Sequence, residues 1–271
     1  MIDKEKLTGQ QSKYILIPYD IIIEKTVDKR RGLVYSYLYS KTGIDNTLLF
    51  NTENLKQYAG KKTGVAHKDD TYTEKILPLL DYMKYQWFLS YDGNIKKRQC
   101  KELYFDKDKI HNYCLNNRFA VIYLDELNII LSDRSNNIYD NRFDSSIVLL
   151  VFLYLRANIP IRHNEYCDNA EAFNAYYKSI GDDIGLSERT VSKAVSVLVD
   201  LGLTYVRERS PVKYYDKKTK EYKFRTPTNI FCNTYKRKKR GADVYLEAKG
   251  DGYYSVEVEN KIKYLEEHNI L

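Results

Sequence analysis

Cysteine is scarce in this chain of 271 residues, and its spacing argues against the usual structural roles of that residue. The four cysteines stand at positions 100, 114, 167 and 232, and no two of them form a Cys-x-x-Cys pair. We therefore expect reduced thiols in the cytoplasm and no disulfide framework. A zinc site made by Cys100, His111 and Cys114 is disfavoured because it lacks a fourth ligand.

Long hydrophobic runs are also absent. The densest run, Ile147 to Leu155, is well short of the ~18 residues that a membrane-spanning helix needs. The residues that follow Met1 to Lys6 lack the apolar stretch of a secretory signal peptide, so we expect no membrane partner. Tyrosine is very frequent (27 residues), together with many Lys, Asn and Ile. That usage is typical of AT-rich bacterial genomes, and the sequence therefore predicts a bacterial cytoplasmic protein.

Motifs of catalysis are missing as well. None of the four histidines forms the His-x-His pair of a metal-dependent rolling-circle nickase, and the His-x-x-Arg of a tyrosine recombinase is not found. Gly60-Lys-Lys-Thr matches the second half of a phosphate-binding loop, but Leu55 stands where the first glycine is required. A Ser-His-Asp triad stays open, although no motif supports one. The sequence therefore predicts no enzyme, no metal and no cofactor.

The charge of the chain is distributed unevenly. Hydrophobic residues make up 43% of the chain, enough for a packed core, and the formal net charge is +7. The segment from Arg207 to Arg240 holds 13 Lys and Arg against 3 acidic residues, a net of +10, so the remainder carries −3. Positive charge concentrated in one segment favours a polyanionic partner such as nucleic acid.

The stretch from Tyr177 to Leu203 has the pattern of a helix, a tight turn and a second helix. The first helix should end near Gly185, and Ser187 is a good N-cap for the second because its hydroxyl can accept from a backbone N–H. Gly202 should end the second helix in a left-handed conformation. Five apolar residues recur at helical spacing and should face inward: Val191, Ala194, Val195, Leu198 and Leu201.

A basic hairpin should follow these helices. Leu203 to Arg207 alternates like a strand, and aromatic segments at Tyr214–Tyr215 and Tyr222 flank the cationic run Asp216 to Lys220. Two helices, a turn and a basic hairpin make a winged helix, and the short or cationic side chains on the outer face of its second helix suit a major groove. Two alternatives stay open: a helix pair that packs on the rest of the chain, and a winged helix that binds protein.

The first half of the chain repeats this order. A strand-like leader from Tyr14 to Ile23 matches a second leader at Phe119 to Asp125, with Ile17 and Asp20 answered by Ile122 and Asp125. The apolar pattern of Lys75 to Phe88 aligns with that of Lys193 to Val206, although chance similarity of two amphipathic helices is the alternative. We therefore expect an α+β, mostly helical fold with two tandem winged helices at residues 14–105 and 119–235, a linker helix at 106–118, and a basic run with a C-terminal helix at 236–271.

The leader Tyr14-Ile-Leu-Ile-Pro-Tyr-Asp, the helix near Leu33 and the winged-helix pattern resemble replication initiators of plasmids and phages from low-GC Gram-positive bacteria. The tandem arrangement is similar to initiators with two winged helices that bind direct repeats at an origin. The resemblance covers most of residues 14–235. It implies origin binding, contact with host replication proteins and, in some members, a homodimer. The alternatives are a winged-helix transcriptional repressor and, from a different class, a protein-docking scaffold of a replication or segregation complex.

We therefore expect sequence-specific binding to double-stranded DNA, without catalytic residues. The second helix of the C-terminal unit should read the major groove through Ser187, Arg189, Thr190, Ser192 and Lys193. Its wing should contact phosphates or the minor groove through Lys213, Lys217, Lys218, Lys220 and Lys223. The parallel residues of the first unit are Lys61, Lys62, Lys68, Thr73 and Lys75, with Lys96, Lys97 and Arg98 in its hairpin. The run Lys236, Arg237, Lys238, Lys239 and Arg240 should be a phosphate-contacting arm, with a solvated linker as the alternative.

Overall fold

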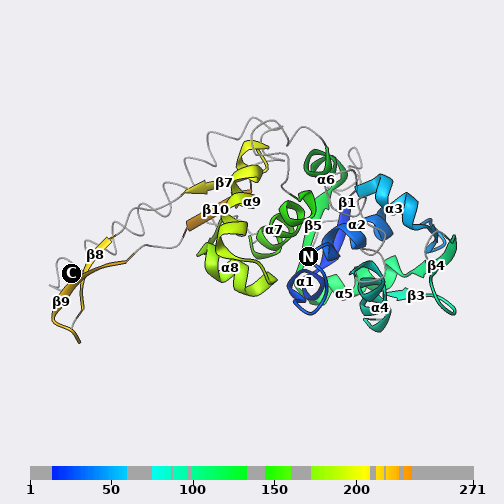
Figure 1. Ribbon diagram of the computed structural model, residues 1–271, viewed down its shortest axis with the longest axis horizontal. Helices are drawn as coiled ribbons and strands as arrows, with labels where there is room; N and C mark the ends of the chain where they lie inside the picture. The colour runs from blue at the N-terminus through cyan, green and yellow to red at the C-terminus, as the bar shows by residue number, and fades with distance from the viewer. Residues whose placement is uncertain are drawn as a thin grey trace.

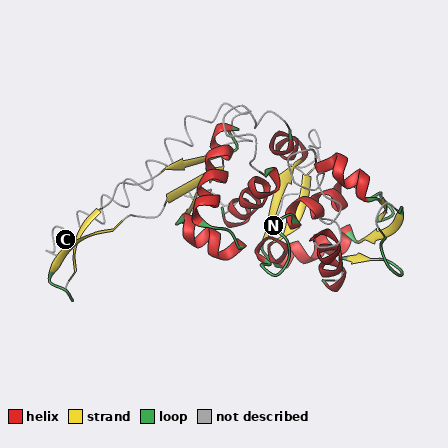
Figure 2. Cartoon of the chain, in the orientation of Figure 1, coloured by secondary structure: helices red, strands yellow, loops and turns green. Residues whose placement is uncertain are grey.

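The fold belongs to the α+β class, as the sequence predicts (Figures 1 and 2). The computed structural model describes residues 14–59, 75–86, 88–96, 99–132, 144–159, 172–207, 212–216, 218–225 and 229–233. Within these ranges helices dominate, and the strands form four small antiparallel sheets.

The first half of the chain combines short helices with short strands. Its elements are β1 (Tyr14–Pro18), α1 (Tyr19–Ile23), α2 (Arg31–Lys41), β2 (Thr47–Phe50), α3 (Thr52–Ala59), α4 (Leu77–Tyr85), β3 (Leu89–Ser90) and β4 (Lys101–Phe105). Pro78 lies in the first turn of α4, where a proline removes no hydrogen bond of the helix. Helix α5 (Lys107–Asn116) follows, and Asp106 caps it by accepting from the backbone N–H of Lys109 at 2.8 Å.

The second half repeats this order of elements, with the additional strand pair β8–β9 between β7 and β10. It comprises β5 (Phe119–Tyr123), α6 (Leu124–Leu131), α7 (Ser145–Asn158), β6 (Ala172–Ala175), α8 (Tyr177–Ile184), α9 (Glu188–Asp200), β7 (Thr204–Arg207), β8 (Val212–Asp216), β9 (Glu221–Arg225) and β10 (Asn229–Asn233). The three-stranded sheets have matching orders, β2-β4-β3 and β6-β10-β7, in which the last strand lies between the other two. Helices α3 and α8 both have eight residues. The internal repeat is therefore visible in the topology, while the domain boundaries stay a prediction.

The two leaders differ from the expected single strands. The stretch from Tyr14 to Ile23 divides at Pro18 into β1 and α1, and the second leader divides in the same way into β5 and α6. The alignment of Ile17 with Ile122 agrees with these boundaries. What the sequence did not predict is that β1 and β5 pair with each other, antiparallel, with Tyr14 opposite Tyr123 and Pro18 opposite Phe119. The leaders therefore join the two halves.

Helix α7 lies at the centre of the molecule in Figure 1 and contacts α1, α2, α6, α8 and α9. All its residues from Ser145 to Arg156 are buried, which explains why its sequence is hydrophobic on every face. Helix α2 packs closely on it, because a methyl group at Gly32 would lie 2.7 Å from Cδ1 of Leu153. One continuous hydrophobic core runs from Ile15 to Phe231 and includes both halves.

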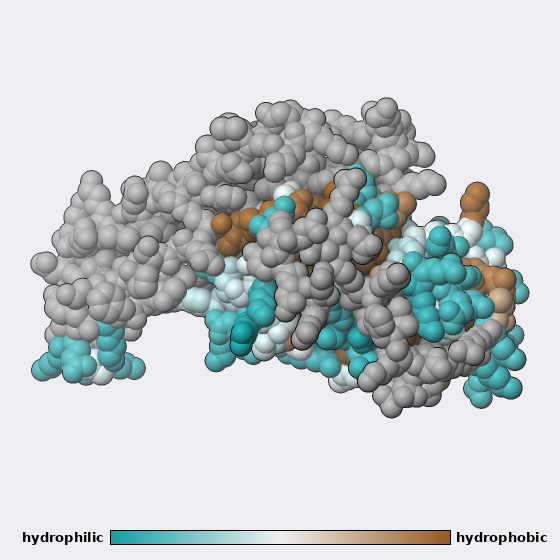
Figure 3. Space-filling view, turned by 45° about the horizontal axis from the view of Figure 1, so that its top comes forward, coloured by the Kyte–Doolittle hydropathy of each residue, from teal (hydrophilic) through white to brown (hydrophobic). Residues whose placement is uncertain are grey.

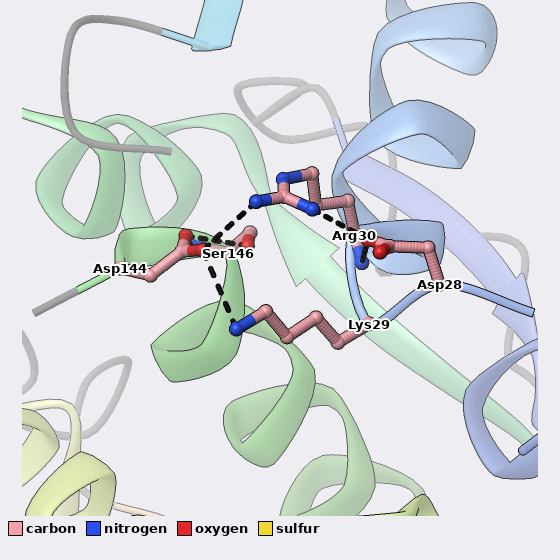
Figure 4. A network of polar contacts seen from close by, with 5 residues as sticks. All are labelled: Asp28, Lys29, Arg30, Asp144 and Ser146. Carbon is pink, nitrogen blue, oxygen red and sulfur yellow. Dashed lines mark hydrogen bonds and ion pairs between the residues drawn. The ribbon is translucent and has the colours of Figure 1, made fainter. Parts of the chain in front are cut away.

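Ion pairs join the beginnings of α2 and α7 (Figure 4). Lys29 Nζ and Arg30 Nη2 lie 3.9 Å and 3.6 Å from the carboxylate of Asp144. The same carboxylate caps α7 by accepting from the backbone N–H of Ser146, and Asp28 accepts from the backbone N–H of Arg30 at 2.9 Å. Each aspartate therefore lies near the positive end of a helix dipole, and the basic residues tie the two ends together.

A second ion pair fixes the leader of the second half to α7. Glu126 on α6 is fully buried, and one carboxylate oxygen accepts from Arg156 Nη2 at 2.8 Å. The other oxygen accepts from the backbone N–H of Tyr123, and Arg156 Nε donates to the carbonyl of Val121. Both carboxylate oxygens of Glu126, and Nε and Nη2 of Arg156, have partners. If one member of the pair were lost, the charge of the other would remain buried without compensation.

Glu126→Gln should destabilise the chain strongly. The amide keeps the shape of the side chain but leaves the buried guanidinium of Arg156 without its counter-charge, so we expect a loss of about 3 kcal/mol or more in the free energy of unfolding. The measurement is urea denaturation. Glu53→Gln is the matched control, because the Glu53–Lys56 pair is partly exposed on α3 and should contribute less than about 0.5 kcal/mol. Equal losses in the two variants would contradict the structural role of the buried pair.

Candidate nucleic-acid interface

Helices α8 and α9 are joined by a tight turn, as the sequence predicts. Gly185 ends α8 with a φ of +75°, in the left-handed region, and its backbone N–H donates to the carbonyl of Gly181. Leu186 N–H donates to the same carbonyl at 2.9 Å. A methyl group at Gly181 would lie only 2.3 Å from the carbonyl oxygen of Leu186. Two glycines therefore set this turn, one through its conformation and the other through lack of a side chain.

The N-cap of α9 is the predicted one. Ser187 Oγ accepts from the backbone N–H of Thr190 at 3.2 Å, and the two hydroxyls lie 2.7 Å apart. Gly202 follows the helix with a φ of +66°, also as predicted. These two local signals mark both ends of α9 correctly.

The inner face of α9 packs on α7 and α8. Four of the five residues expected to face inward are buried, namely Val191, Ala194, Val195 and Leu198. Leu201 is only half-buried. Val197, which was not among the predicted residues, is buried as well, so the buried face of α9 is wider than predicted.

The outer face of α9 offers polar and cationic groups to solvent. Arg189 and Lys193 are exposed, and Thr190, Ser192 and Ser196 are half-buried between them. Ser196 Oγ donates to the carbonyl of Ser192, so that hydroxyl is partly committed to the helix itself. The predicted residues of this helix therefore lie together on one accessible surface, near a capped helix N-terminus.

Helix α8 is held on α7 by a buried tyrosine. Tyr154 Oη donates to a carboxylate oxygen of Asp183 at 2.5 Å, and the ring lies 6.1 Å from that of Phe173 in an edge-to-face contact. Burial and the bond to Asp183 raise the pKa of Tyr154, so the phenol remains protonated and keeps donating at neutral pH. Lys178 lies exposed in the first turn of α8, where helix-turn-helix proteins approach the phosphate backbone, and sequence reasoning did not single it out.

The expected hairpin is present as β8 and β9, with Val212 opposite Arg225 and Asp216 opposite Glu221. It extends away from the helices in Figure 1. Lys218 and Lys220 in its turn are exposed, and Lys220 adopts a left-handed φ of +58°. In Figure 3 the tip of the hairpin is a hydrophilic surface. Lys213 and Lys223 lie in the two strands, opposite Phe224 and Tyr214.

The corresponding face of the first half is different. Lys75 is exposed just before α4, and Lys96 is exposed in the loop between β3 and β4. On α4 itself, Asp81 accepts from Tyr91 Oη at 2.6 Å. Lys84 Nζ donates to the carbonyl of Tyr91 and lies 4.2 Å from the centroid of its ring. The outer face of α4 therefore carries an acidic group, and its lysine is engaged by the next segment.

The predicted alignment of Lys193 to Val206 with Lys75 to Phe88 is wrong by three residues. Both helices close with the same hydrogen bond, from Leu203 N–H to Leu198 O in one and from Phe88 N–H to Met83 O in the other. A shift of three residues almost restores the face of a helix, so the apolar pattern alone did not reveal the error. In the corrected register Lys193 corresponds to Pro78 and Ser196 corresponds to Asp81. Lys75 is therefore not the counterpart of Lys193 in the first half.

Several predicted site residues lie outside the described part of the chain. They are Lys61, Lys62, Lys68, Thr73, Lys97, Arg98, Lys217 and the run from Lys236 to Arg240, together with the expected C-terminal helix. The side chain of Lys213 is likewise not described. Among the described residues, His, Cys, Asp and Glu form no group of three or more suited to a metal ion. The helices of the described ranges are all too short or too polar to cross a membrane.

Comparison of the sequence with models of known protein families, and with curated proteins, gave no match.

Gly181→Ala should destabilise the chain by about 1–3 kcal/mol, because the new methyl group meets a backbone carbonyl that cannot move without opening the turn. Gly32→Ala is the matched control within another helix. Its methyl group meets the end of the flexible Leu153 side chain, and the better helix propensity of alanine offsets part of the cost, so the change should stay within about 1 kcal/mol. Thermal unfolding of both variants checks the difference. A larger loss in Gly32→Ala would show that the turn is not as tight as described.

Proposed function

We propose that the chain is a sequence-specific double-stranded DNA-binding protein in which each half is a winged helix and α9 reads the major groove. The observation that carries the proposal is the two-sided character of α9. Its inner face is buried on α7, while its outer face exposes Arg189 and Lys193 close to the capped N-terminus. A helix that is anchored in this way can enter a major groove without losing its packing.

The groups on the outer face fit two kinds of DNA contact. Arg189 can donate two hydrogen bonds to the O6 and N7 atoms of a guanine, and Lys193 can bind a base edge or a phosphate. The hydroxyls of Thr190 and Ser192 are short donors for either. The exposed Lys218 and Lys220 at the tip of the β8–β9 hairpin would contact phosphates or the minor groove, and such contacts hold the protein in register on the duplex.

The two halves would contribute unequally. The outer face of α4 carries Asp81, which repels phosphate, and Lys84 is engaged with Tyr91. Pro78 stands where the second half has Lys193. We therefore assign base reading to the second half, while the first half supports it and presents its own loop and hairpin to DNA or to another protein.

We propose replication initiation at the repeats of a plasmid or phage origin as the biological role, on the basis of the resemblance carried by the leader and the tandem order of elements. Transcriptional repression uses the same kind of DNA contact and is the alternative. Selection of bound duplexes from random sequence, followed by a search for those sites near the gene, separates the two. Clustered direct repeats support an initiator, one palindrome at a promoter supports a repressor, and failure to bind any duplex supports a protein-docking scaffold.

Arg189→Ala should remove most discrimination between the selected site and a scrambled duplex. Loss of a bidentate contact to guanine costs about 1–3 kcal/mol at the correct site and little elsewhere. Binding of each variant to both duplexes is measured by fluorescence anisotropy at fixed salt. Lys84→Ala on α4 is the matched control and should keep the discrimination. If Lys84→Ala loses it while Arg189→Ala does not, the base-reading helix is α4 instead of α9.

Ser187 allows helix capping to be separated from DNA binding. Ser187→Ala removes the cap and should destabilise the chain by about 1 kcal/mol, with little effect on affinity once the chain is folded. Ser187→Asp keeps a cap acceptor at a favourable end of the helix dipole but adds a negative charge toward the DNA, so stability is retained and affinity falls. Thermal unfolding and DNA titration of the two variants give the comparison. An Asp variant with undiminished affinity would place the N-terminus of α9 away from the DNA.

A further inference from the structure

One side chain of the first half is buried against the helix pair of the second. Arg31, the first residue of α2, is 1% exposed. Its Nη2 donates to the carbonyl of Ile22 at 2.7 Å and to the carbonyl of Ile184 at 2.9 Å, and its Nε donates to Ile22 at 3.0 Å. Ile184 is the last residue of α8, directly before the turn to α9. Burial lowers the pKa of Arg31 to about 10, so the guanidinium remains charged at neutral pH.

This contact fixes the segment between α1 and α2 beside the turn. The guanidinium lies at the negative end of the α8 dipole, where a cation is favourable, and it joins that end to the end of α1. Lys25 lies in the segment that this bond holds. A methyl group at Gly185 would lie 3.7 Å from Cγ of Lys25, so the aliphatic part of the lysine rests on the turn. Lys25 is nevertheless exposed.

We propose that the first half supplies part of the DNA-binding surface of the second: Lys25, held beside the α8–α9 turn by the Arg31 bonds to Ile22 and Ile184, contacts the phosphate backbone next to the groove that α9 enters. The inference rests on the proposed function. The turn immediately precedes the N-terminus of α9, so a cation that lies on it is near the backbone bordering the reading helix. A flexible ammonium suits a phosphate more than a fixed base edge.

The contact has a distinct signature. One lost phosphate contact should lower the steepness of the logarithmic dependence of affinity on salt by about 0.9 and should weaken the selected and scrambled duplexes by the same factor. Lys25→Gln tests this in the full chain. Lys41→Gln is the matched control, because Lys41 is exposed and lies at the other end of α2, about 15 Å along the helix from Arg31. It removes the same charge but should leave the salt dependence unchanged.

Arg31 is a positioning residue in this account, and a double-mutant cycle tests its role. Arg31→Lys keeps the charge but cannot bridge two carbonyls with the same planar fork. It should reduce the salt dependence by the same amount as Lys25→Gln, and the double variant should show no further reduction. A purely structural role for Arg31 would change thermal stability without this lack of additivity.

The outcomes are separable. Reduced salt dependence in Lys25→Gln, with Lys41→Gln unchanged and site selectivity retained, supports the inference. If Lys25→Gln and Lys41→Gln both bind DNA with the affinity and the salt dependence of the wild-type chain, the inference is overturned and the proposed function stays in place. Additive effects of Arg31→Lys and Lys25→Gln overturn the positioning role. If the wild-type chain binds neither duplex at any salt concentration, the proposed function fails and this inference fails with it.

Discussion

The antiparallel pairing of β1 with β5 is the constraint on which the rest of the structure depends. It joins residues 14–18 to residues 119–123, two segments separated by the whole first half of the chain. Because each strand leads into its own helices, the pairing brings α2 beside α7, close enough that a methyl group at Gly32 would touch the end of the Leu153 side chain. The same arrangement lets Arg31 reach the carbonyl end of α8. Separating the two halves would therefore leave β1 without its strand partner and uncover the face of α7 that packs on α1 and α2.

Local signals were sufficient to predict the helix pair of the second half. Gly185, Ser187 and Gly202 act on their immediate neighbours. Their positions therefore mark the end of α8 and both ends of α9 correctly. Long-range pairing leaves no such local trace, so the pairing of the leaders was missed. The short helices α1 and α6 were missed because each leader was expected to be one strand-like stretch. Strand β6 was missed because four residues are too few to show a period. The three-residue error between α4 and α9 has the same origin, since only the helix ends, not the apolar stripe, define the register.

A repeated topology does not give repeated chemistry. Both halves have a helix that is buried on one side, but the exposed side carries Arg189 and Lys193 in α9 and Asp81 and Lys84 in α4. Lys84 is held by Tyr91, whereas no comparable contact covers the exposed cations of α9 among the described residues. Sequence reasoning expected parallel roles for the two halves. The corrected register removes the lysine on which that expectation rested.

The most direct measurement is hydrogen–deuterium exchange of the full chain with and without a duplex that it selects from random sequence. DNA binding through α9 predicts slower exchange in α8, in the turn and in the first turns of α9, and also around Lys25, whose side chain lies against that turn. Exchange in α4 should be unchanged. Protection of α4 with no change in α9 would contradict the assignment of the reading helix, and the absence of protection anywhere would contradict DNA binding itself.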